Sequence, residues 1–525
     1  MIITEILTEN AKKYGNKTAL IELEPAIGSR REITWKQFNK KTNKAANALR
    51  AIGIEKQDKV IQLMTNSMEW LPIYFGILKS GALAVPLNFR FFAEKIKKCA
   101  QISEAKAIFF GKEFIERIES IKNSLDKIIK TYIFTGGEDI CPSYAISYEK
   151  FIANAQDNEP NEKPNIEDDA AIYFTSGTTG LPKAVLLTHK NLESACITEQ
   201  KHHHQTNEDN FLCIPPLYHT GAKMHWFGNF IAGAKSVLLK GVKPEWILNA
   251  ISEEKITIVW LLVPWAHDIL IALENKKLNL KDYDASSLRL MHIGAQPVPP
   301  TLIKKWMQYF PNRQYDTDYG LTESTGPGCV HLGMENTRKV GAIGLAGYKW
   351  NTKIVDDNGK QIAADQIGEL LVKGPGVMKQ YYKNPEETKK ALKNEWLYTG
   401  DLAKKDKDGF IWLVDRKKDL VITGGENIYP VEIENFLMTN NKIKDAAVIG
   451  IHDDRLGEIA AAIIEAKPNY ILVEEEIKTF CEKLPRYKRP RKIFFDKVPR
   501  NPTGKIEKPE LRKKYAKHSS VIEFE

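Results

Sequence analysis

The sequence predicts an α/β protein with a large N-terminal domain of β-α-β layers, an antiparallel β module, and a small α+β C-terminal domain. Three observations lead to this class. Strand-like runs alternate with amphipathic helical stretches over residues 1–170 and 211–310. Hairpin signals begin near Tyr348, and a separate set of helical and strand-like patterns begins after residue 418. Strand–helix–strand units with short links imply parallel strands joined by right-handed crossovers.

The N-terminal strands and helices follow one another closely. Apolar runs of strand length alternate with longer amphipathic segments, and Gly81 marks one helix end. The expected strands are 58–64, 82–88, 105–111, 235–240 and 256–263, and the expected helices are 66–81, 91–105 and 243–255.

The antiparallel module is predicted from paired β-rich runs joined by turn residues. Residues 352–374 contain two such runs around Asp-Asn-Gly, and 396–425 continue the pattern with turns at KDKDG and TGG. The C-terminal domain then has its own elements, expected at 429–440, 444–454, 459–467 and 473–484.

The composition is that of a large globular protein and excludes disordered, fibrous and channel-forming classes. The 525 residues are 43% apolar and 27% charged, with a net charge of +9. The most apolar window, 256–273, is interrupted by Pro264, His267 and Asp268 and cannot span a bilayer. The N-terminus lacks the basic start and apolar stretch of a signal peptide. We therefore expect a cytoplasmic protein without a transmembrane segment.

Neither the cysteines nor the basic residues predict a metal site or nucleic-acid binding. The six cysteines are scattered singly and are expected to be reduced thiols. The dense basic run 484–492 has no base-stacking module beside it, so nucleic acid is not an expected partner. The triplet His202–His204 suggests a metal, but three adjacent side chains do not converge, and we expect a solvated loop. The oligomeric state is left open, a homodimer included.

A loop rich in glycine and hydroxyl residues predicts a polyphosphate site. It runs from Tyr173 to Lys183 (YFTSGTTGLPK) between two apolar runs. Backbone N–H groups and hydroxyls of such a loop can surround a polyphosphate, and Lys183 adds positive charge. The loop is not a P-loop, because Pro182 precedes the lysine and Ala184 follows it.

This loop resembles the phosphate-loop signature YTSGTTGxPKGV of the adenylate-forming superfamily, which includes acyl-CoA synthetases, luciferases and peptide-synthetase adenylation domains. Ala184 stands where the family usually has Gly. Further blocks resemble the family's motifs in the family's order: 216–219 (PLYH), 294–297 (GAQP), 318–323 (DYGLTE), 398–401 (YTGD), 415–419 (DRKKD), 424–427 (GGEN) and 499–505 (PRNPTGK). The resemblance covers nearly the whole chain.

The resemblance implies a site for ATP, Mg²⁺ and a carboxylic acid. The implied catalytic residues are Lys505, His219, Thr322 and Glu323. The implied contacts to ATP or AMP are Thr175, Ser176, Gly177, Thr178, Thr179, Gly180, Lys183, Gly294, Ala295, Gln296, Asp318, Tyr319, Gly320, Asp401 and Arg416. Thr175 and Glu323 are the implied metal ligands. These residue types suit the chemistry, because positive charge must cancel the repulsion between a carboxylate and a triphosphate.

The resemblance also implies two half-reactions in one site and two domains. These are an adenylation domain, residues 1–417, and a mobile domain, 418–525, which carries the catalytic lysine. Rotation about Lys418 would remove Lys505 and bring Gly424, Gly425 and Glu426 toward coenzyme A. The charged residues 416–419 suit a short exposed hinge. Coenzyme A is the expected thiol, because no carrier domain follows Lys505.

By the same resemblance, the acyl pocket follows His219 and precedes Tyr319. The candidate lining residues are Lys223, His225, Trp226, Trp265, Thr317 and Asp318. Many family members carry Gly where Asp318 stands, so this carboxylate would narrow the pocket floor. Two interpretations stay open: Asp318 faces a polar or cationic acyl group, or it turns away and pairs with Lys223 or a backbone donor. So many polar candidates suit a long fatty acid less well.

The sequence therefore predicts an acyl-CoA synthetase, which converts a carboxylic acid and ATP to acyl-AMP and pyrophosphate and then transfers the acyl group to the thiol of coenzyme A. Three alternatives stay open: a ligase that loads a carrier-protein thiol, a luciferase-like oxygenase, and a nucleotide-binding regulator without catalysis. Retention of Lys183, Glu323 and Lys505 argues against the regulator. The acid itself is not predicted.

Overall fold

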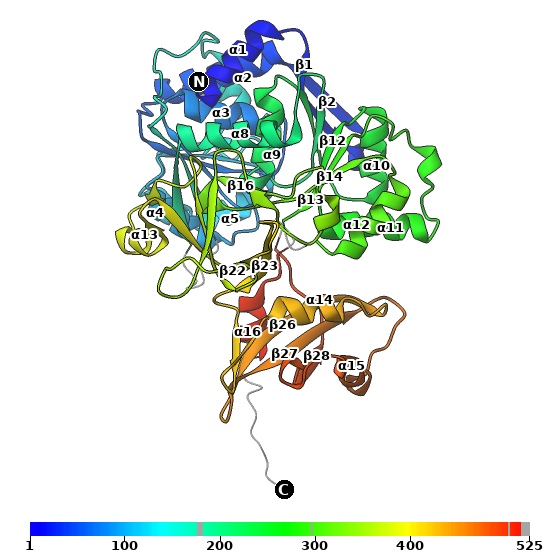
Figure 1. Ribbon diagram of the computed structural model, residues 1–525. Helices are drawn as coiled ribbons and strands as arrows, with labels where there is room; N and C mark the ends of the chain where they lie inside the picture. Colours follow the sequence, from blue (N-terminus) through cyan, green and yellow to red (C-terminus); the bar gives the residue numbers. More distant parts are fainter. Residues whose placement is uncertain (176–181, 296–297, 502–504, 516–525) are drawn as a thin grey trace.

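The computed structural model describes residues 1–175, 182–295, 298–501 and 505–515. A large body holds the N-terminal elements, and a smaller C-terminal body lies below it in Figure 1. The two bodies meet beside β22 (Trp396–Lys405) and β23 (Ile411–Arg416), as Figure 1 shows. This arrangement confirms the predicted fold class.

Two mainly parallel sheets form the frame of the large body. The first has the order β14 (Gln314–Asp316), β13 (Leu290–Gly294), β12 (Ile258–Leu262), β10 (Asn210–Cys213), β11 (Lys235–Leu239), β1 (Thr18–Glu24), β2 (Ser29–Thr34). The second has the order β20 (Gln380–Tyr381), β9 (Lys183–Thr188), β8 (Asp169–Thr175), β4 (Leu83–Pro86), β3 (Lys59–Leu63), β5 (Ala107–Phe110), β6 (Thr131–Phe134), β7 (Ile146–Ser147). The central strands of both are almost entirely buried, as expected for parallel strands covered on both faces.

Two smaller sheets complete the large body, and a fifth lies in the C-terminal body. The smaller ones are β15 (Asp318–Leu321), β16 (Gly326–His331), β17 (Leu345–Ala346), and β18 (Asn351–Val355), β19 (Gly368–Lys373), β22, β21 (Leu392–Lys393), with β23 paired to β22. The C-terminal sheet has the order β25 (Glu426–Ile428), β24 (Val421–Thr423), β27 (Gly457–Ala466), β26 (Ile443–Asp453), with β28 (Lys492–Phe495) paired to β27. Antiparallel pairing of β18 with β19 confirms the hairpin predicted at 352–374.

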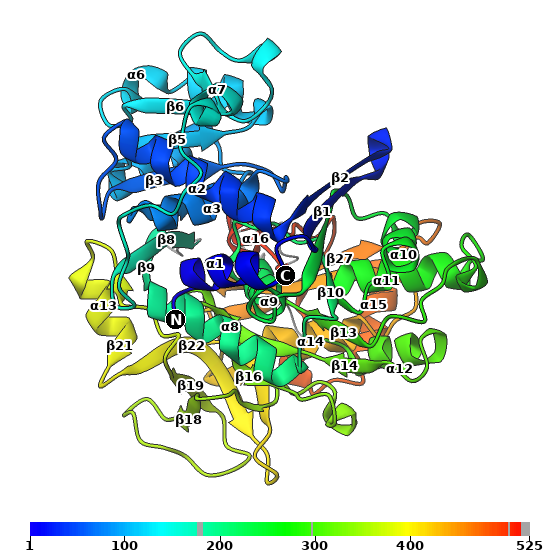
Figure 2. The same ribbon diagram turned by 90° about the horizontal axis from the view of Figure 1, so that it is seen from above.

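The helices cover these sheets. In chain order they are α1 (Ile3–Lys13), α2 (Trp35–Ala51), α3 (Trp70–Lys79), α4 (Ala93–Ser103), α5 (Ile115–Glu119), α6 (Lys122–Leu125), α7 (Tyr148–Ala153), α8 (His189–His203), α9 (Thr220–Ile231), α10 (Pro244–Glu253), α11 (Val263–Glu274), α12 (Pro300–Tyr309), α13 (Pro385–Ala391), α14 (Pro430–Leu437), α15 (Glu474–Cys481) and α16 (Lys508–Tyr515). Side chains of α2, α3, α8 and α9 share one apolar core with β3, β4 and β8. Figure 2 shows α2 and α3 together over β3.

One predicted helix begins later than its sequence pattern indicates. The segment 66–81 becomes helical only at Trp70. Asn66 instead donates its side-chain amide to the Pro215 carbonyl at 2.9 Å and accepts the Leu217 N–H at 2.8 Å. A long-range pair of hydrogen bonds therefore replaces the first helical turn, and it fixes the segment just before His219.

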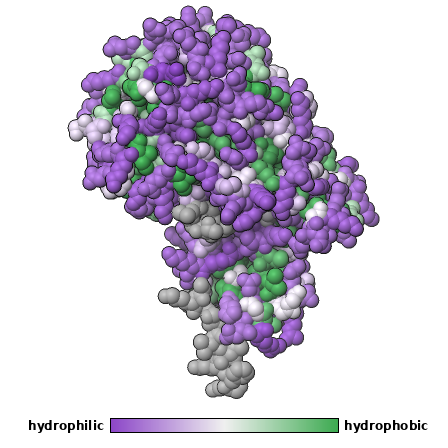
Figure 3. Space-filling model, turned by 90° about the vertical axis from the view of Figure 1, so that its left-hand side faces the viewer, coloured by the Kyte–Doolittle hydropathy of each residue, from purple (hydrophilic) through white to green (hydrophobic). Residues whose placement is uncertain are grey.

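The face drawn in Figure 3 is mainly hydrophilic, with apolar side chains in small separate groups. Among the described residues, no helix is both long and apolar enough to cross a lipid bilayer.

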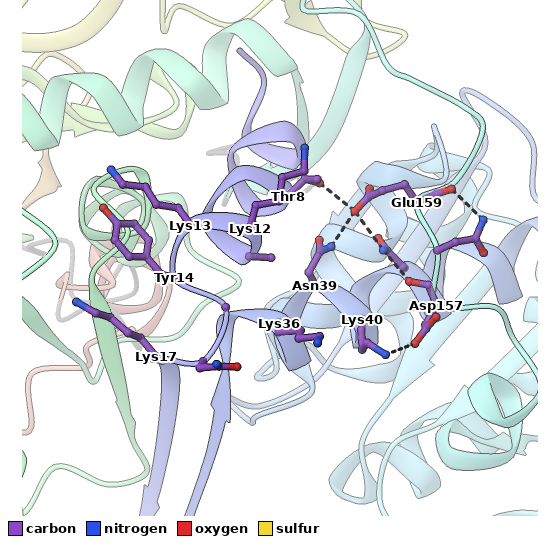
Figure 4. Close-up of a pocket in the computed structure, with 15 residues that line it drawn as sticks. Thr8, Lys12, Lys13, Tyr14, Lys17, Lys36, Asn39, Lys40, Asp157 and Glu159 are labelled. Atoms are coloured by element: carbon purple, nitrogen blue, oxygen red, sulfur yellow. Dashed lines mark hydrogen bonds and ion pairs between the residues drawn. The ribbon is translucent and has the colours of Figure 1, made fainter.

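A buried lysine joins α1, α2 and α3 to the segment that leads into β8. Lys79 is 4% exposed, and its ammonium donates to Thr8, Asn39, Asn43 and, at 2.6 Å, to Glu159. Figure 4 shows the Thr8 and Asn39 side chains directed at the Glu159 carboxylate as well. Glu159 is thus the counter-ion that compensates the burial of this charge.

We predict that Glu159→Gln destabilises the large body by about 1–3 kcal/mol, because it leaves the Lys79 ammonium buried without a counter-ion. We expect a smaller loss of stability than for a fully buried ion pair, because the Glu159 side chain is 44% exposed. The measurement is the shift in the thermal unfolding midpoint. Asp157→Asn is the control, since it breaks the solvent-screened pair of Asp157 with Lys40. Equal shifts for the two variants would contradict the prediction.

Candidate functional site

The two described ends of the glycine-rich loop are held side by side. Thr175 ends β8, Lys183 begins β9, and the two residues are direct partners across this antiparallel pair. The predicted contacts Ser176, Gly177, Thr178, Thr179 and Gly180 lie outside the described residues, as does Gln296. The described strands therefore fix where the loop starts and returns.

Lys183 belongs to a network with Glu323. Its Nζ lies 2.6 Å from Glu387 Oε2 of α13 and 4.9 Å from the ring centroid of Tyr381. The Tyr381 hydroxyl donates to Glu323 Oε1 at 2.8 Å. One tyrosine therefore connects the predicted phosphate-binding lysine to the predicted metal-binding carboxylate, which lies in a short 3₁₀ turn, Thr322–Ser324.

Asp401 is the centre of a second group of polar contacts. Its Oδ2 accepts the Tyr319 hydroxyl at 2.5 Å, and its Oδ1 lies 3.2 Å from Arg416 Nε. The backbone explains this meeting, because Asp401 and Arg416 are direct partners in the β22–β23 pair. Asp401 is buried, and its charge raises the pKa of Arg416 above the ordinary value. Three sequence-predicted nucleotide contacts thus lie together.

Lys505 of the C-terminal body lies at this same site. Burial, followed by the positive charge of Arg416, lowers the pKa of the Lys505 ammonium to about 8. Asp401 and Glu323 act on it in the opposite direction. The C-terminal body is therefore oriented with its predicted catalytic lysine beside the predicted nucleotide-binding residues of the large body.

His219 lies within the electrostatic reach of Lys505. It caps the N-terminus of α9, where its Nδ1 accepts the Gly221 N–H at 3.2 Å. Burial, and then the charge of Lys505, lowers the pKa of His219 to about 3. The imidazole is therefore neutral at physiological pH, and the cap at Nδ1 leaves Nε2 to carry the proton.

The remaining nucleotide candidates lie at strand ends close by. Gly294 ends β13, and Ala295 follows it with a positive φ of 69°. Gly320 lies next to Tyr319 in β15, and Thr322 opens the turn that carries Glu323. Gly294 lies above His292: a Cβ at this position would be 3.4 Å from His292 Nε2, an ordinary contact distance.

The predicted acyl-pocket residues divide into two groups. Lys223 is buried, donates to the Leu217 carbonyl at 2.7 Å, and lies 4.3 Å from the Tyr173 ring centroid. Trp226 packs in the aromatic core against residues of α2 and α3, and half-buried Trp265 packs against two apolar clusters. These contacts are those of core side chains. His225, Thr317 and Asp318 form the other group, around a buried polar cluster.

Asp318 lies beside two histidines, which the sequence did not predict as its partners; the interpretation in which it faces a polar acyl group stays a prediction. Its Oδ1 lies 3.2 Å from His292 Nε2 and its Oδ2 lies 3.6 Å from His225 Nε2. Pairing with Lys223 is therefore wrong, because the Lys223 ammonium is held by Leu217. Thr317 is buried beside Gly294.

The expectation that His202–His204 form a solvated loop is also wrong. α8 extends to His203, which is buried, and its Nε2 lies 3.0 Å from Asp316 Oδ2. His202 is stacked on His331 with the ring centroids 3.9 Å apart, and only His204 is exposed. The helix directs adjacent residues to different sides, which is why the triplet does not act as a unit.

The predicted hinge and thiol-channel loop lie in the connection to the C-terminal sheet. Lys418 is exposed between the end of β23 and the start of β24. Gly424 and Gly425 form a two-residue turn before Glu426, with φ values of 55° and 87°. Both residues need positive φ in such a hairpin turn, which favours glycine.

Sequence reasoning missed several residues that organise this site. Asn66, Tyr381 and Glu387 contact predicted site residues from distant parts of the chain. Glu199, His203, His292, Asp316 and His331 surround Asp318 and His225. For one pair a signal existed: Glu199 and His203 are four residues apart, on one face of a helix.

Comparisons with known proteins agree with this geometry. The chain matches the family described as AMP-binding enzyme over residues 7–382 and the AMP-binding enzyme C-terminal domain over 432–505. It is 32% identical to a long-chain-fatty-acid–CoA ligase of Mycobacterium tuberculosis, covering 94% of this chain and 95% of that protein. It is 30% identical to a feruloyl-CoA synthase of Amycolatopsis sp., covering 92% and 94%.

Solved structures give the same result. The anthranilate CoA ligase AuaEII in complex with anthranoyl-AMP superposes with a TM-score of 0.88 at 28% identity, covering 98% of this chain and 97% of that one. ATP-bound MatB from Rhodopseudomonas palustris gives a TM-score of 0.88 at 26% identity, covering 99% and 100%. The family matches span both bodies of the structure, and on this ground the chain belongs to the AMP-binding enzyme family.

Proposed function

We propose that this chain is an ATP-dependent acid–CoA ligase. It converts a carboxylate and ATP to acyl-AMP and pyrophosphate, and then transfers the acyl group to the thiol of coenzyme A with release of AMP. The relatives named above are CoA ligases and synthases, and they match over more than nine-tenths of this chain. This favours coenzyme A over a carrier-protein thiol and over a luciferase-like oxygenation.

One observation carries the proposal: Lys505 lies in the site formed by Asp401, Arg416 and Glu323. A ligase of this kind brings a carboxylate and a triphosphate together, and their repulsion has to be offset by fixed positive charge. Lys505 provides that charge from the C-terminal body. A nucleotide-binding regulator would not need a lysine held at this position against the cost of burial.

The other site residues have side chains that suit the substrates of this reaction. Asp401 accepts hydrogen bonds from the ribose hydroxyls, with Arg416 beside it, and Tyr319 lies against the adenine. Neutral His219 offers its Nε2–H to the reacting carboxylate or phosphate. The side-chain oxygens of Glu323 and Thr175 are the ligand type that Mg²⁺ prefers, so the donor set fits this ion. When bound, Mg²⁺ neutralises phosphate charge.

The acid is proposed to be compact or to carry a polar group. The region expected to form the pocket floor contains Asp318 with His225 and His292, which are buried. This polar floor suits a short acyl group, or one that ends in a polar group, better than a long apolar chain. Named relatives act on aliphatic and aromatic acids alike, so the acid has to be identified by experiment.

The test is AMP release from ATP and Mg²⁺ with a panel of short, long, aromatic, bile-type and betaine acids, with and without coenzyme A. AMP release that depends on one acid class and on coenzyme A is expected. Pyrophosphate exchange that ignores coenzyme A would overturn the choice of thiol. Tight AMP binding without turnover of any acid would favour the regulator.

For Lys505→Ala, we predict a loss of about 10²–10³-fold in adenylate formation, with thioester formation from supplied acyl-AMP retained. In the wild type, kcat/KM for adenylation should fall as pH rises through about 8, because the Lys505 ammonium is present below its pKa and lost above it. Lys505→Arg should remove this alkaline decline from its residual activity. An equal loss in both half-reactions would contradict the assigned role.

For Lys418→Pro, we predict the reverse pattern, because fixing φ at the hinge opposes rotation of the C-terminal body. Adenylation should persist while thioester formation falls about tenfold or more. Lys418→Ala is the control, since it removes the side chain and leaves backbone rotation intact. Normal thioester formation by the proline variant would rule out a hinge at this residue and the domain boundary between residues 417 and 418.

For Glu387→Gln, we predict about two- to fivefold tighter ATP binding, measured by calorimetry. The substitution frees Lys183 from the 2.6 Å ion pair that competes with phosphate. Glu386→Gln is the matched control, because it makes the same charge change at an exposed neighbour. If the two variants bind ATP with equal affinity, the gain comes from the change in net charge and the prediction is wrong.

A further inference from the structure

Seven ionisable side chains meet inside the large body, between the two helices α8 and α9 and the strands β13 to β16. We call them the histidine cluster: Glu199, His203, His225, His292, Asp316, Asp318 and His331. Their side chains are at most 5% exposed. Such a concentration of charge in an apolar core is costly unless something compensates it.

Direct contacts compensate only part of the cluster. Asp316 Oδ2 is hydrogen-bonded to His203 Nε2 at 3.0 Å and to His331 Nδ1 at 3.3 Å. Asp316 Oδ1 accepts the backbone N–H groups of Thr317 and Gly333. Asp316 is therefore saturated, and it fixes the orientation of the His203 ring. This arrangement is typical of a carboxylate that orients a metal-binding histidine.

Many other polar atoms of the cluster are buried without a hydrogen-bond partner among the described residues. They are His203 Nδ1, His225 Nε2, His292 Nδ1 and Nε2, His331 Nε2, both carboxylate oxygens of Glu199, and Asp318 Oδ2. Buried polar atoms in native proteins are almost always paired with protein, water or an ion. Three neighbouring histidines thus each have a nitrogen that lies 3.2–3.6 Å from a carboxylate oxygen without good hydrogen-bond geometry, and a cation shared by these groups would satisfy both sides.

The spacing fits one metal ion. One nitrogen from each of His203, His225 and His292 lies within 4.8 Å of the others. Tetrahedral zinc with ligand distances near 2.0–2.1 Å separates its ligand atoms by about 3.3–3.4 Å. The three histidine nitrogens are thus close to the spacing that one such ion requires. The Asp318 carboxylate adds negative charge beside them, with Oδ1 3.2 Å from His292 Nε2 and Oδ2 3.6 Å from His225 Nε2.

The charge of the cluster favours a cation as well. Glu199, Asp316 and Asp318 form no ion pair with lysine or arginine within the described ranges; their charged partners are histidines. Neutral imidazoles bind a divalent ion through their lone pairs and leave its charge to offset the carboxylates. A water molecule would satisfy some hydrogen bonds and none of the charge.

We propose that His203, His225 and His292 bind a divalent transition-metal ion, with Zn²⁺ as the best match to three histidine ligands and one open position. This site is separate from the proposed Mg²⁺ at Glu323, which uses oxygen ligands alone. Histidine ligands favour zinc and related ions over Mg²⁺.

The ion would lie directly beneath the proposed acyl pocket. Trp260 spans the gap, since its ring centroid is 4.5 Å from that of His225 and it comes close to the Gly221 position beside His219. His292 lies below Gly294, within 3.4 Å of the position of a Cβ there. This consequence rests on the proposed function. A metal ion at this position would fix the floor of the acyl pocket and limit how deep the acyl group can extend.

The experiment measures the metal content of tag-free protein after expression with added Zn²⁺ and gel filtration. About one equivalent of Zn²⁺ per chain is expected. His225→Gln and His292→Gln should each reduce retained metal at least tenfold. His189→Gln is the matched control, because His189 is a buried histidine outside the cluster, in α8, the helix that also carries His203. No substrate is needed, so a failure here differs from a failure of the ligase proposal.

A second measurement tests the site in the wild-type protein, so that the result does not depend on whether a variant folds. Stripped wild-type protein is titrated with Co²⁺, and the visible absorption of a tetrahedral site should saturate at one equivalent and disappear on addition of Zn²⁺. Absence of bound Zn²⁺, Co²⁺, Ni²⁺ and Fe²⁺ in both measurements would overturn the proposal. So would a metal-free protein in which Asp318→Asn changes the preferred acid, since the cluster would then recognise a polar acyl group directly.

Discussion

The half-buried Lys505, within electrostatic reach of Arg416, is the constraint on which the arrangement of the two bodies depends. Two positive groups are brought together, and burial lowers the pKa of the lysine to about 8. Asp401 opposes this repulsion, and its own position is fixed by the Tyr319 hydroxyl and by pairing of β22 with β23. The β22–β23 pairing in the large body therefore positions the carboxylate that favours the charged form of Lys505.

Two polar centres interrupt the apolar core, and they are compensated in different ways. Around Asp401, charged partners from two bodies meet at an accessible junction, where the phosphates of a nucleotide can add negative charge. In the histidine cluster, three carboxylates meet imidazoles in the interior, and several polar atoms there form no hydrogen bond within the described part of the chain. The first centre is suited to bind and release a mobile substrate. The second has the burial and the donor atoms of a permanent site.

Local patterns in the sequence were enough for the fold class and for the motif blocks. Buried runs of strand length predicted β3, β4 and β5, and the Gly-Gly pair predicted a turn that the structure forms between β24 and β25. Contacts between distant segments were not predictable: Asn66 fixes the chain before His219, and Tyr381 joins Lys183 to Glu323. The surroundings of the histidine triplet were predictable only in part. Spacing along α8 placed Glu199 and His203 on one face, but only the tertiary fold reveals that β14 and β16 bring Asp316 and His331 to them.

The lowered pKa of Lys505 also bears on the direction of the domain rotation in the proposed cycle. Without nucleotide, the ammonium is desolvated next to Arg416, so moving it toward water relieves that cost. A bound triphosphate would reverse this preference. Its negative charge stabilises the Lys505 and Arg416 cations, and with them the present orientation of the C-terminal body. In the proposed cycle, the departure of pyrophosphate would leave less negative charge to hold Lys505 in place, and the relief of desolvation would again favour the proposed rotation about Lys418. The sequence of binding and release thus follows from the same electrostatics that suit the site to adenylation.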